Sequence, residues 1–344
     1  MPSLDPLTDF GNHRDLVVIG ASAGGVEALK AVAEGLPGDL DAAVCVVLHI
    51  APRSSSALAA ILERAGPLPC RAAHDDGPLR SGEILVAPPD RHLVIEDGRA
   101  RVTVGPRENG HRPAVDVLFR SAAGARRRRV VGVVLSGTRD DGAVGLASIK
   151  AAGGAAVVQS PTDAMYPGMP TSALANVVAD AVVPLARMGQ TIAAIVRGDD
   201  VSEGAGANQP PEDPERDERL TSVCPECGGV LTEESEAGTP YWECHVGHRY
   251  SPASLADAQA NGVEAALWTA VRALRDRGAI LEQLAKQSDA RGQPRSARHF
   301  EQQADSARAQ ADVVRDALDV AAATALQQVP AADDDAGAEP TAPR

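Results

Sequence analysis

The sequence predicts an α/β fold with a doubly wound, mostly parallel sheet in its first two hundred residues. Continuous apolar segments recur there and alternate with stretches of helical periodicity, the pattern of buried parallel strands covered by helices. Aromatic residues make up only 2% of the chain, so Val, Leu, Ile and Ala must build the core, as in such strands. The strands are expected at 16–19, 42–50, 84–87, 130–135, 155–158 and 181–183, and the helices at 25–34, 55–65, 115–123, 142–152 and 171–178.

Two other segments interrupt or follow this alternation. Residues 82–104 contain short alternating stretches around Asp97-Gly98, a pair typical of hairpin turns, so we expect a β-hairpin insertion there. Beyond residue 253, apolar residues repeat at helical spacing in two stretches separated by Gly292-Gln293-Pro294. This pattern predicts an antiparallel helical hairpin or a coiled coil.

The charge and composition of the chain exclude several classes of protein. Its 344 residues include 33 Lys+Arg and 47 Asp+Glu, a formal net charge of −14 that repels nucleic acids and anionic membranes. The N-terminal residues lack the apolar core of a signal peptide, and no stretch reaches the roughly 18 uncharged apolar residues of a membrane span. We therefore expect a cytoplasmic protein that binds no nucleic acid and does not insert into membranes. The 5 cysteines do not form a disulfide framework, since Cys45 falls in an apolar strand, Cys70 in a loop, and the other three cluster.

Ser22 lies at the apex of a glycine-rich turn between a predicted strand and a predicted helix. Its small neighbours would leave its hydroxyl exposed, and N–H groups at the start of the helix would face an oxyanion, as a nucleophilic serine requires. Glycine-rich turns of this kind also bind phosphates and dinucleotides. By itself the turn leaves a nucleophile and an anion-binding loop equally open.

Two further polar residues are predicted at the carboxyl ends of neighbouring strands. His49 ends the strand at 42–50, and Asp141 follows the strand at 130–135 directly before a helix. Ligands and catalytic groups in open α/β sheets gather beyond the carboxyl ends of the strands, so Ser22, His49 and Asp141 are predicted to meet there. Taken singly, His49 could be a histidine satisfied locally at a strand end, and Asp141 could be a helix cap.

Together the three side chains predict a catalytic triad that hydrolyses an ester or amide bond. Ser22 would be the nucleophile, His49 would take and return its proton, and Asp141 would orient the imidazole. The order Ser, His, Asp along the chain differs from that of the α/β-hydrolases, so the turn motif does not identify that fold. A dinucleotide-binding loop would need glycine where Ser22 stands and an acidic residue where His49 stands.

Several segments, in this order, resemble the catalytic domain of the chemotaxis protein-glutamate methylesterases, the CheB family. The matching segments are 20–25 (GASAGG), His49, 82–92 (GEILVAPPDRH), 112–119 (RPAVDVLF), 135–142 (LSGTRDDG) and 159–170 (QSPTDAMYPGMP). The resemblance implies hydrolysis of γ-glutamyl methyl esters on chemoreceptor helices with release of methanol, and in many members deamidation of glutamine at the same positions. It also implies Ser22, His49 and Asp141 as the triad, and no cofactor for catalysis.

Two features depart from the family pattern. Family members usually begin with a phospho-accepting receiver domain, whereas the first strand here starts near the N-terminus, so we expect no control by phosphorylation in cis. The family usually has Met-Gly where this chain has Thr138-Arg139. Because a backbone N–H binds an oxyanion whatever the side chain, we expect activity with an altered substrate fit. His92, Arg112 and Asp116 lie in family-matching segments, where a groove-lining role and a structural role both stay open.

A cluster of cysteines and histidines near the C-terminal third has the spacing of a zinc ribbon. Cys224 and Cys227 form a C-x-x-C pair followed by two glycines, and Cys244 precedes His245 and His248. We expect His248 to be the fourth ligand, since its spacing from Cys244 is usual, and His245 is the alternative. Four protein ligands imply a structural Zn²⁺ rather than a catalytic one.

The chain is therefore expected to have six parts and one leading function. The parts are an N-terminal extension (1–13), a CheB-like catalytic domain (14–197), an acidic linker (198–221), a zinc-ribbon module (222–252), a helical hairpin or coiled coil (253–327) and a disordered acidic tail (328–344). The leading hypothesis is a serine hydrolase that demethylates a chemoreceptor or another helical signalling protein. The alternative is a non-catalytic or redirected CheB-like binding module with another partner. The zinc ribbon is a candidate for targeting or restraining the esterase, and the C-terminal helices are a candidate for self-association.

Overall fold

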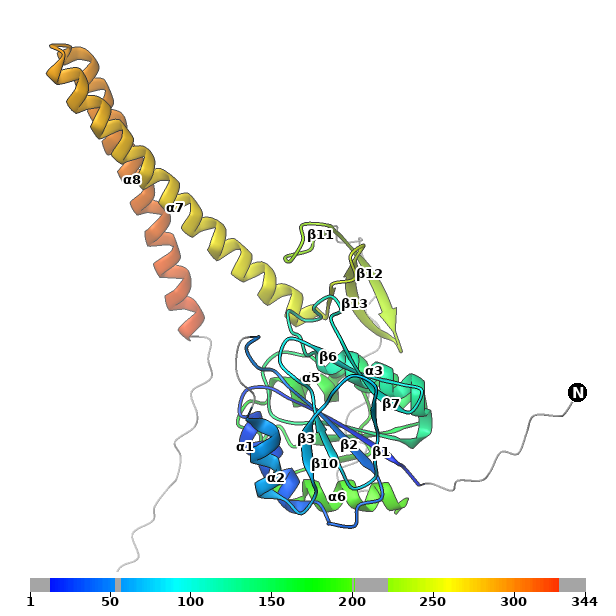
Figure 1. The fold of residues 1–344 in the computed structure, drawn as a ribbon. Coiled ribbons are helices and arrows are strands. Elements are labelled where there is room, and N and C mark those ends of the chain that lie inside the picture. Colours follow the sequence, from blue (N-terminus) through cyan, green and yellow to red (C-terminus); the bar gives the residue numbers. More distant parts are fainter. Residues whose placement is uncertain (1–12, 53–56, 200, 202–221, 328–344) are drawn as a thin grey trace, which may run out of the picture. The chain divides into compact units, whose positions relative to one another are not determined.

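The computed structural model describes residues 13–52, 57–199, 201 and 222–327, which belong to two compact units, Met1–Ala258 and Gln259–Arg344 (Figure 1). The first unit contains the predicted α/β segments and the Cys/His cluster, and the second contains most of two long helices. The expected N-terminal extension up to residue 12, most of the acidic linker and the whole acidic tail lie outside the described residues.

A seven-stranded parallel sheet forms the centre of the first unit. Its strands are β1 (Leu16–Ala21), β2 (Ala43–Leu48), β3 (Cys70–Ala72), β5 (Ile84–Val86), β8 (Val130–Val134), β9 (Ala155–Gln159) and β10 (Ala181–Val183). They lie in the order β10-β9-β8-β1-β2-β5-β3, and every neighbouring pair is parallel. The chain thus begins in the middle of the sheet and builds outward on both sides, which confirms the predicted doubly wound fold.

Helices cover both faces of this sheet. They are α1 (Gly25–Gly35), α2 (Leu58–Ala65), α3 (Val115–Arg126), α4 (Ala143–Ala151), α5 (Gly168–Asn176) and α6 (Leu185–Arg197). Successive side chains of a strand point to opposite faces, so Val17 and Ile19 of β1 pack with α1, α2 and α6, whereas Leu16 and Val18 pack with α3, α4 and α5. All six residues of β1 are buried, which explains its uninterrupted apolar sequence.

The hairpin expected within residues 82–104 is present but shorter than predicted. Strands β6 (His92–Glu96) and β7 (Arg99–Thr103) pair antiparallel around Asp97-Gly98, and both turn residues have positive φ. The two-residue strand β4 (Gly77–Pro78) adds to β7. Strand β5, at the start of the expected insertion, belongs to the parallel sheet, as the predicted strand at 84–87 does.

The expectation that Cys70 lies in a loop is wrong. Residues Cys70–Ala72 form the edge strand β3, which pairs with β5 from Cys70 opposite Ile84 to Ala72 opposite Val86. A three-residue strand is too short to show a hydrophobic period, and Arg71 at its centre interrupts the apolar pattern. Burial at this edge, together with nearby acidic groups, raises the pKa of the Cys70 thiol to about 12.

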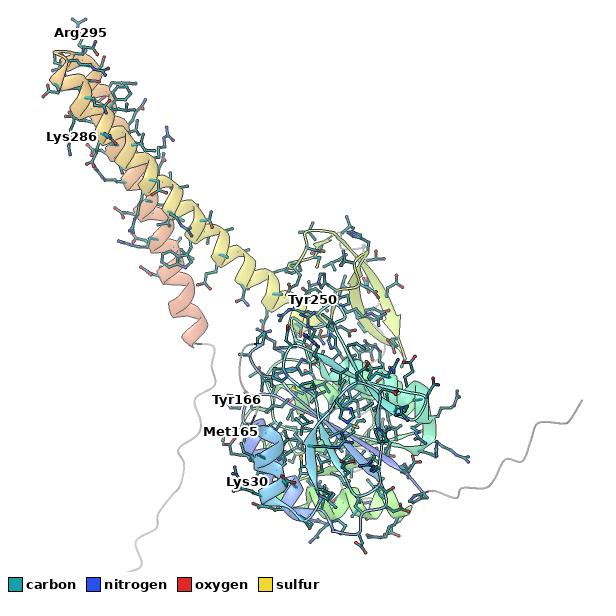
Figure 2. The ribbon with its side chains drawn as sticks, in the orientation of Figure 1. Lys30, Met165, Tyr166, Tyr250, Lys286 and Arg295 are labelled. Atoms are coloured by element: carbon teal, nitrogen blue, oxygen red, sulfur yellow. The ribbon has the colours of Figure 1, made fainter. Side chains whose placement is uncertain are left out.

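A four-stranded antiparallel sheet carries the Cys/His cluster of the first unit. Its strands are β11 (Ser222–Val223), β12 (Val230–Glu236), β13 (Thr239–Cys244) and β14 (Arg249–Tyr250). We call residues 222–251 the Cys/His module. Its hydrophobic core is small: the buried side chains of Cys224, Leu231, Cys244 and Tyr250 pack with that of Leu255, which follows the module in the sequence (Tyr250 is labelled in Figure 2).

Two long helices make up the second unit, α7 (Pro252–Ala290), whose first residues belong to the first unit, and α8 (Pro294–Gln327). Gly292 between them has a φ of 70°, which glycine adopts without strain. Glu282 on α7 forms an ion pair with Arg308 on α8. The helices therefore pair as an antiparallel hairpin, one of the two arrangements that the sequence predicted. Within the described ranges, no helix is long and apolar enough to cross a membrane.

Candidate active site

Ser22 occupies the turn between β1 and α1. Its N–H donates to the carbonyl of Ser136, 3.0 Å away, in the loop that follows β8. Gly24 precedes α1 with a φ of 69°, and a Cβ atom at this position would come within 2.9 Å of the Ser136 hydroxyl. Glycine is therefore required at position 24. The turn places Ser22 at the carboxyl edge of the sheet, beside the N-terminal end of α1.

His49 follows β2 and faces Ser22. The backbone N–H of His49 donates to the carbonyl of Ala21 (3.2 Å), which extends the pairing of β1 with β2 by one residue. Its ring nitrogen Nδ1 lies 3.1 Å from Ser22 Oγ, and its side chain is only 6% exposed. A largely desolvated imidazole within hydrogen-bond distance of a serine hydroxyl is suited to act as a general base.

Asp141 approaches His49 from the loop between β8 and α4. Its Oδ2 atom accepts hydrogen bonds from His49 Nε2 (2.6 Å) and from the N–H of Val115 (2.7 Å). Its Oδ1 atom accepts from the N–H of Asp116 (3.1 Å) and from the side-chain amide of Asn109 (2.9 Å). Because Asp141 takes the hydrogen bond from Nε2–H, the Nδ1 atom of the neutral ring is left to accept one from the serine hydroxyl.

The surroundings of Asp141 hold it ionised. Burial alone would raise the pKa of its carboxyl, but the hydrogen bond and charge of His49, followed by the charge of His111, keep that pKa well below its usual value. The adjacent Asp116 is the opposite case, since burial and the negative charge of Asp141 raise its pKa well above the usual value. The site thus separates the two carboxyls in acidity, and the more acidic one contacts the histidine.

His111 is a site residue that the sequence did not predict. Its ring stacks on that of His49, with the centroids 3.7 Å apart and an angle of 11° between the planes. Burial, followed by the charge of His49, lowers the pKa of His111 to about 4, so this ring is neutral near pH 7. His111 and Asn109 precede α3 in a segment without hydrophobic periodicity. The one signal available was their position directly before the family-matching segment 112–119.

The three residues whose roles stayed open make structural contacts. His92 Nε2 donates to the carbonyl of Pro106 (2.8 Å), and the Arg112 guanidinium donates to Asp90 Oδ1 (3.0 and 2.8 Å). Asp116 is buried and accepts hydrogen bonds from two N–H groups at the start of α4 (3.0 and 2.7 Å). These contacts brace the loops around the candidate site.

The loops beside Ser22 carry two more features. Arg139 has a φ of 67°, a left-handed conformation that is unfavourable for a residue with a side chain, and its guanidinium lies 2.8 Å from Asp257 near the start of α7. Met165 and Tyr166 are exposed, by 66% and 42%, and Met165 lies against the Gly24 position (Figure 2). An apolar surface therefore borders the serine turn.

The Cys/His module brings together four groups that can bind a metal ion. The ligand atoms of Cys224, Cys227, Cys244 and His248 all lie within 4.8 Å of one another, whereas His245 is exposed. The sulfur atoms of Cys227 and Cys244 are 3.7 Å apart, and His248 Nδ1 lies 3.5 Å from Cys244 Sγ. Ligands in a tetrahedron with Zn–S bonds of about 2.3 Å are separated by about 3.7 Å, so this donor set fits zinc.

Known proteins similar to this chain match its α/β segment. The family model described as CheB methylesterase matches residues 17–192. A protein-glutamate methylesterase/protein-glutamine glutaminase of Anaeromyxobacter dehalogenans is 41% identical over 183 residues, which cover 53% of this chain and 54% of that protein. A putative protein of the same description from Leptospira interrogans is 38% identical over 177 residues, which cover 51% of this chain and 92% of that protein.

A solved structure has the same fold. The Thermotoga maritima CheB methylesterase catalytic domain superposes with a TM-score of 0.51 at 29% sequence identity, and the match covers 53% of this chain and 99% of that domain. The chain matches about half the length of the Anaeromyxobacter relative and nearly all of the Thermotoga domain.

Proposed function

Because this chain belongs to the CheB methylesterase family, we propose that it hydrolyses γ-glutamyl methyl esters on a helical signalling protein such as a methylated chemoreceptor. The observation that carries the proposal is the hydrogen-bonded series from Ser22 through His49 to Asp141 at the carboxyl edge of the sheet. A module that only bound modified side chains would have no need of a buried carboxylate that orients a histidine toward a serine. At the same site a glutamine would be deamidated, with ammonia as the leaving group.

In the first half of the proposed reaction, Ser22 Oγ attacks the ester carbonyl carbon while His49 Nδ1 takes the hydroxyl proton. The resulting imidazolium is stabilised by Asp141, whose carboxylate already accepts the Nε2 hydrogen bond. The oxyanion would form near the N-terminal end of α1, where the positive end of the helix dipole stabilises negative charge. Collapse of the tetrahedral intermediate breaks the C–O bond, and the His49 proton leaves with methanol.

The second half returns the enzyme to its starting state. Water attacks the glutamyl ester of Ser22 while His49 takes a proton from the water, and the imidazolium then protonates Ser22 Oγ as the acyl bond breaks. The products are a free glutamate side chain and the original serine. In both halves His49 takes a proton at Nδ1 while its Nε2–H donates to Asp141. The position of Asp141 therefore affects each half.

The exposed pair Met165 and Tyr166 is the proposed contact for the substrate protein. It borders the turn that carries Ser22, and it presents apolar surface that a substrate helix would cover. An ester on the side chain of such a helix would then reach the serine without unfolding of the helix. Methylated receptor helices are substrates of this shape.

We also propose that the Cys/His module holds a structural Zn²⁺. Cys224, Cys227, Cys244 and His248 would fill all four positions of a tetrahedral ion, so the metal would take no part in ester hydrolysis. Its contribution would be to hold together strands whose own apolar core is small. The proposed zinc and the proposed triad belong to the same compact unit of the chain.

Methanol release from a methyl-labelled receptor tests the esterase proposal. We expect Ser22→Ala to lower kcat by at least about a thousandfold, because removal of the nucleophile of a triad leaves only binding and oxyanion stabilisation. Ser81→Ala, at an exposed serine in a turn, is the matched control and should retain full activity. Unchanged methanol release by folded Ser22→Ala protein would show that Ser22 is not the nucleophile.

A further inference from the structure

The end of the Cys/His module contacts the loops that carry the candidate site. We call residues 249–257 the docking segment, which comprises β14, Ser251 and the first residues of α7. The carbonyl of Arg249 accepts a hydrogen bond from the N–H of Asn109 (2.8 Å). The N–H and the hydroxyl of Ser251 both donate to Asn109 Oδ1, at 2.8 and 2.9 Å. The docking segment therefore binds the residue whose amide contacts Asp141.

Asn109 is buried, and every hydrogen-bonding group of its side chain is used. Its Nδ2 atom donates to Asp141 Oδ1 (2.9 Å) and to Asp116 Oδ2 (3.0 Å), while its Oδ1 atom accepts the two hydrogen bonds from Ser251. The ionised carboxylate of Asp141 can only face the NH₂ group, and the Ser251 donors can only face the oxygen. The orientation of the amide is thus determined from both sides, and one of these sides is the docking segment.

A second contact holds the loop next to Asp141 itself. Asp140 accepts hydrogen bonds from the N–H of Ala253 (2.9 Å) and from the hydroxyl of Ser254 (2.6 Å), so its carboxylate caps the first turn of α7. Arg139, one residue earlier, pairs with Asp257. Two consecutive residues before Asp141 are therefore bound by α7, and both contacts are independent of Asn109.

We infer that the docking segment is a positioning element of the active site, which holds Asp141 in place through Asn109 and through Asp140. This inference rests on the proposed esterase function and adds to it a dependence of catalysis on residues far from Ser22 in the sequence. In Ser251→Ala the oxygen of Asn109 would keep the backbone N–H donor but lose the hydroxyl donor, and its amide would be held less firmly against the carboxylate. The histidine would then lose the fixed partner that sets its tautomer and its direction toward Ser22.

Substitutions in the whole 344-residue chain separate this role from a general effect on folding. The first variant combines Ser251→Ala with Ser254→Ala and removes both hydroxyl donors of the docking segment. The second is Asn109→Ala, and the third adds Ser251→Ala to Asn109→Ala. Thr269→Ala is the matched control, since it removes an exposed hydroxyl from α7 outside the docking segment. Circular dichroism and thermal unfolding establish that each variant is folded.

We expect the first two variants to lower kcat for methanol release by about tenfold and to change KM by less than about twofold, because they disturb orientation rather than substrate contact. In the Asn109→Ala background, Ser251→Ala should have no further effect, since its hydroxyl acts on Asp141 only through the amide. The control should match the wild type. Wild-type kcat in the first two variants, or multiplied losses in the third, would overturn the inference.

The pH dependence of kcat/KM is a readout that a purely structural role of Asn109 would leave unchanged. The titratable groups that act on Asp141 include His49, His111, Asp116 and His92, and Asn109 adds an uncharged donor to them. A carboxylate that loses a donor becomes more basic and holds the His49 proton more tightly. In Asn109→Ala the acid limb of kcat/KM should therefore shift to higher pH, and an unshifted limb would contradict the inference.

One further measurement keeps this test separate from the esterase proposal. The rate at which a fluorophosphonate labels Ser22 depends on the same histidine and needs no receptor. If the wild type releases no methanol but labels rapidly, the proposed substrate is wrong, and slower labelling in the Ser251→Ala/Ser254→Ala variant still supports the positioning role. If Asn109→Ala does not fold, kcat and labelling of that serine variant decide the inference.

Discussion

His111 makes the stability of the protein depend on pH through a single ring. Its pKa in the folded protein is about 4, whereas an exposed histidine titrates near 6.5. Between these values the unfolded chain binds more protons, so the contribution of His111 to stability is complete above pH 6.5 and is lost as the pH falls toward 4. His111→Phe keeps an aromatic ring against His49 and removes the titration. Between about pH 7 and about pH 4.5, the free energy of unfolding of this variant should fall by about 2 kcal/mol less than that of the wild type.

Urea unfolding at the two pH values measures this difference. His74→Phe is the matched control, because His74 is an exposed histidine of the same unit, and this variant should lose as much stability as the wild type. Equal losses in the wild type and in His111→Phe would mean that His111 titrates normally in the folded protein.

The sequence indicated some residues of the site and not others, for a physical reason. Ser22, His49 and Asp141 follow apolar strands, and the carboxyl ends of parallel strands meet at one edge, so their proximity was predictable. Asn109 and His111 come from an aperiodic segment before α3, and its path over the site depends on tertiary contacts with residues far away in the chain. One of these contacts is with Ser251, 142 residues later.

Elements show the same division between local pattern and tertiary context. The long buried strands and the helices that follow them were predictable because their apolar periods extend over several residues. Strand β3 was not, because its three residues are held by pairing with β5 rather than by a pattern of their own. The spacing of Cys224, Cys227, Cys244 and His248 predicted a cluster that the structure also brings together, and its metal remains a proposal.

Removal of metal tests the Cys/His module as an element. Its apolar core is small, so most of its folding free energy should come from the proposed zinc, and a chelator should unfold its strands. Trp242 lies in β13, and in a Trp268→Phe background it is the only tryptophan of the chain. We expect chelation to shift its emission to longer wavelength and added Zn²⁺ to reverse the shift. Cys224→Ser should show the shifted emission without chelator. An emission that neither the chelator nor this substitution changes would exclude a structural metal.

At the scale of the whole molecule, the two compact units differ in what they bury. The α/β unit has two cores of branched aliphatic side chains, one on each face of its sheet. The buried side chains of the helical hairpin include many alanines, namely Ala285, Ala297, Ala304, Ala307 and Ala311. An alanine removes much less apolar surface from water than leucine or valine does, so the hairpin gains less free energy from packing.

We therefore expect the hairpin to unfold before the α/β unit, in a separate transition. On heating, far-UV circular dichroism should lose helical signal first, and calorimetry should resolve two peaks. Leu281 is one of the large side chains buried in the described part of the hairpin, and Leu281→Ala should destabilise the hairpin by about 2 kcal/mol. That loss should lower the midpoint of the first transition by about 10 °C and leave the midpoint of the second unchanged. Leu146→Ala, in α4, should move only the second midpoint. A single transition that both substitutions shift would mean that the long helix α7, which belongs to both units, couples them into one cooperative structure.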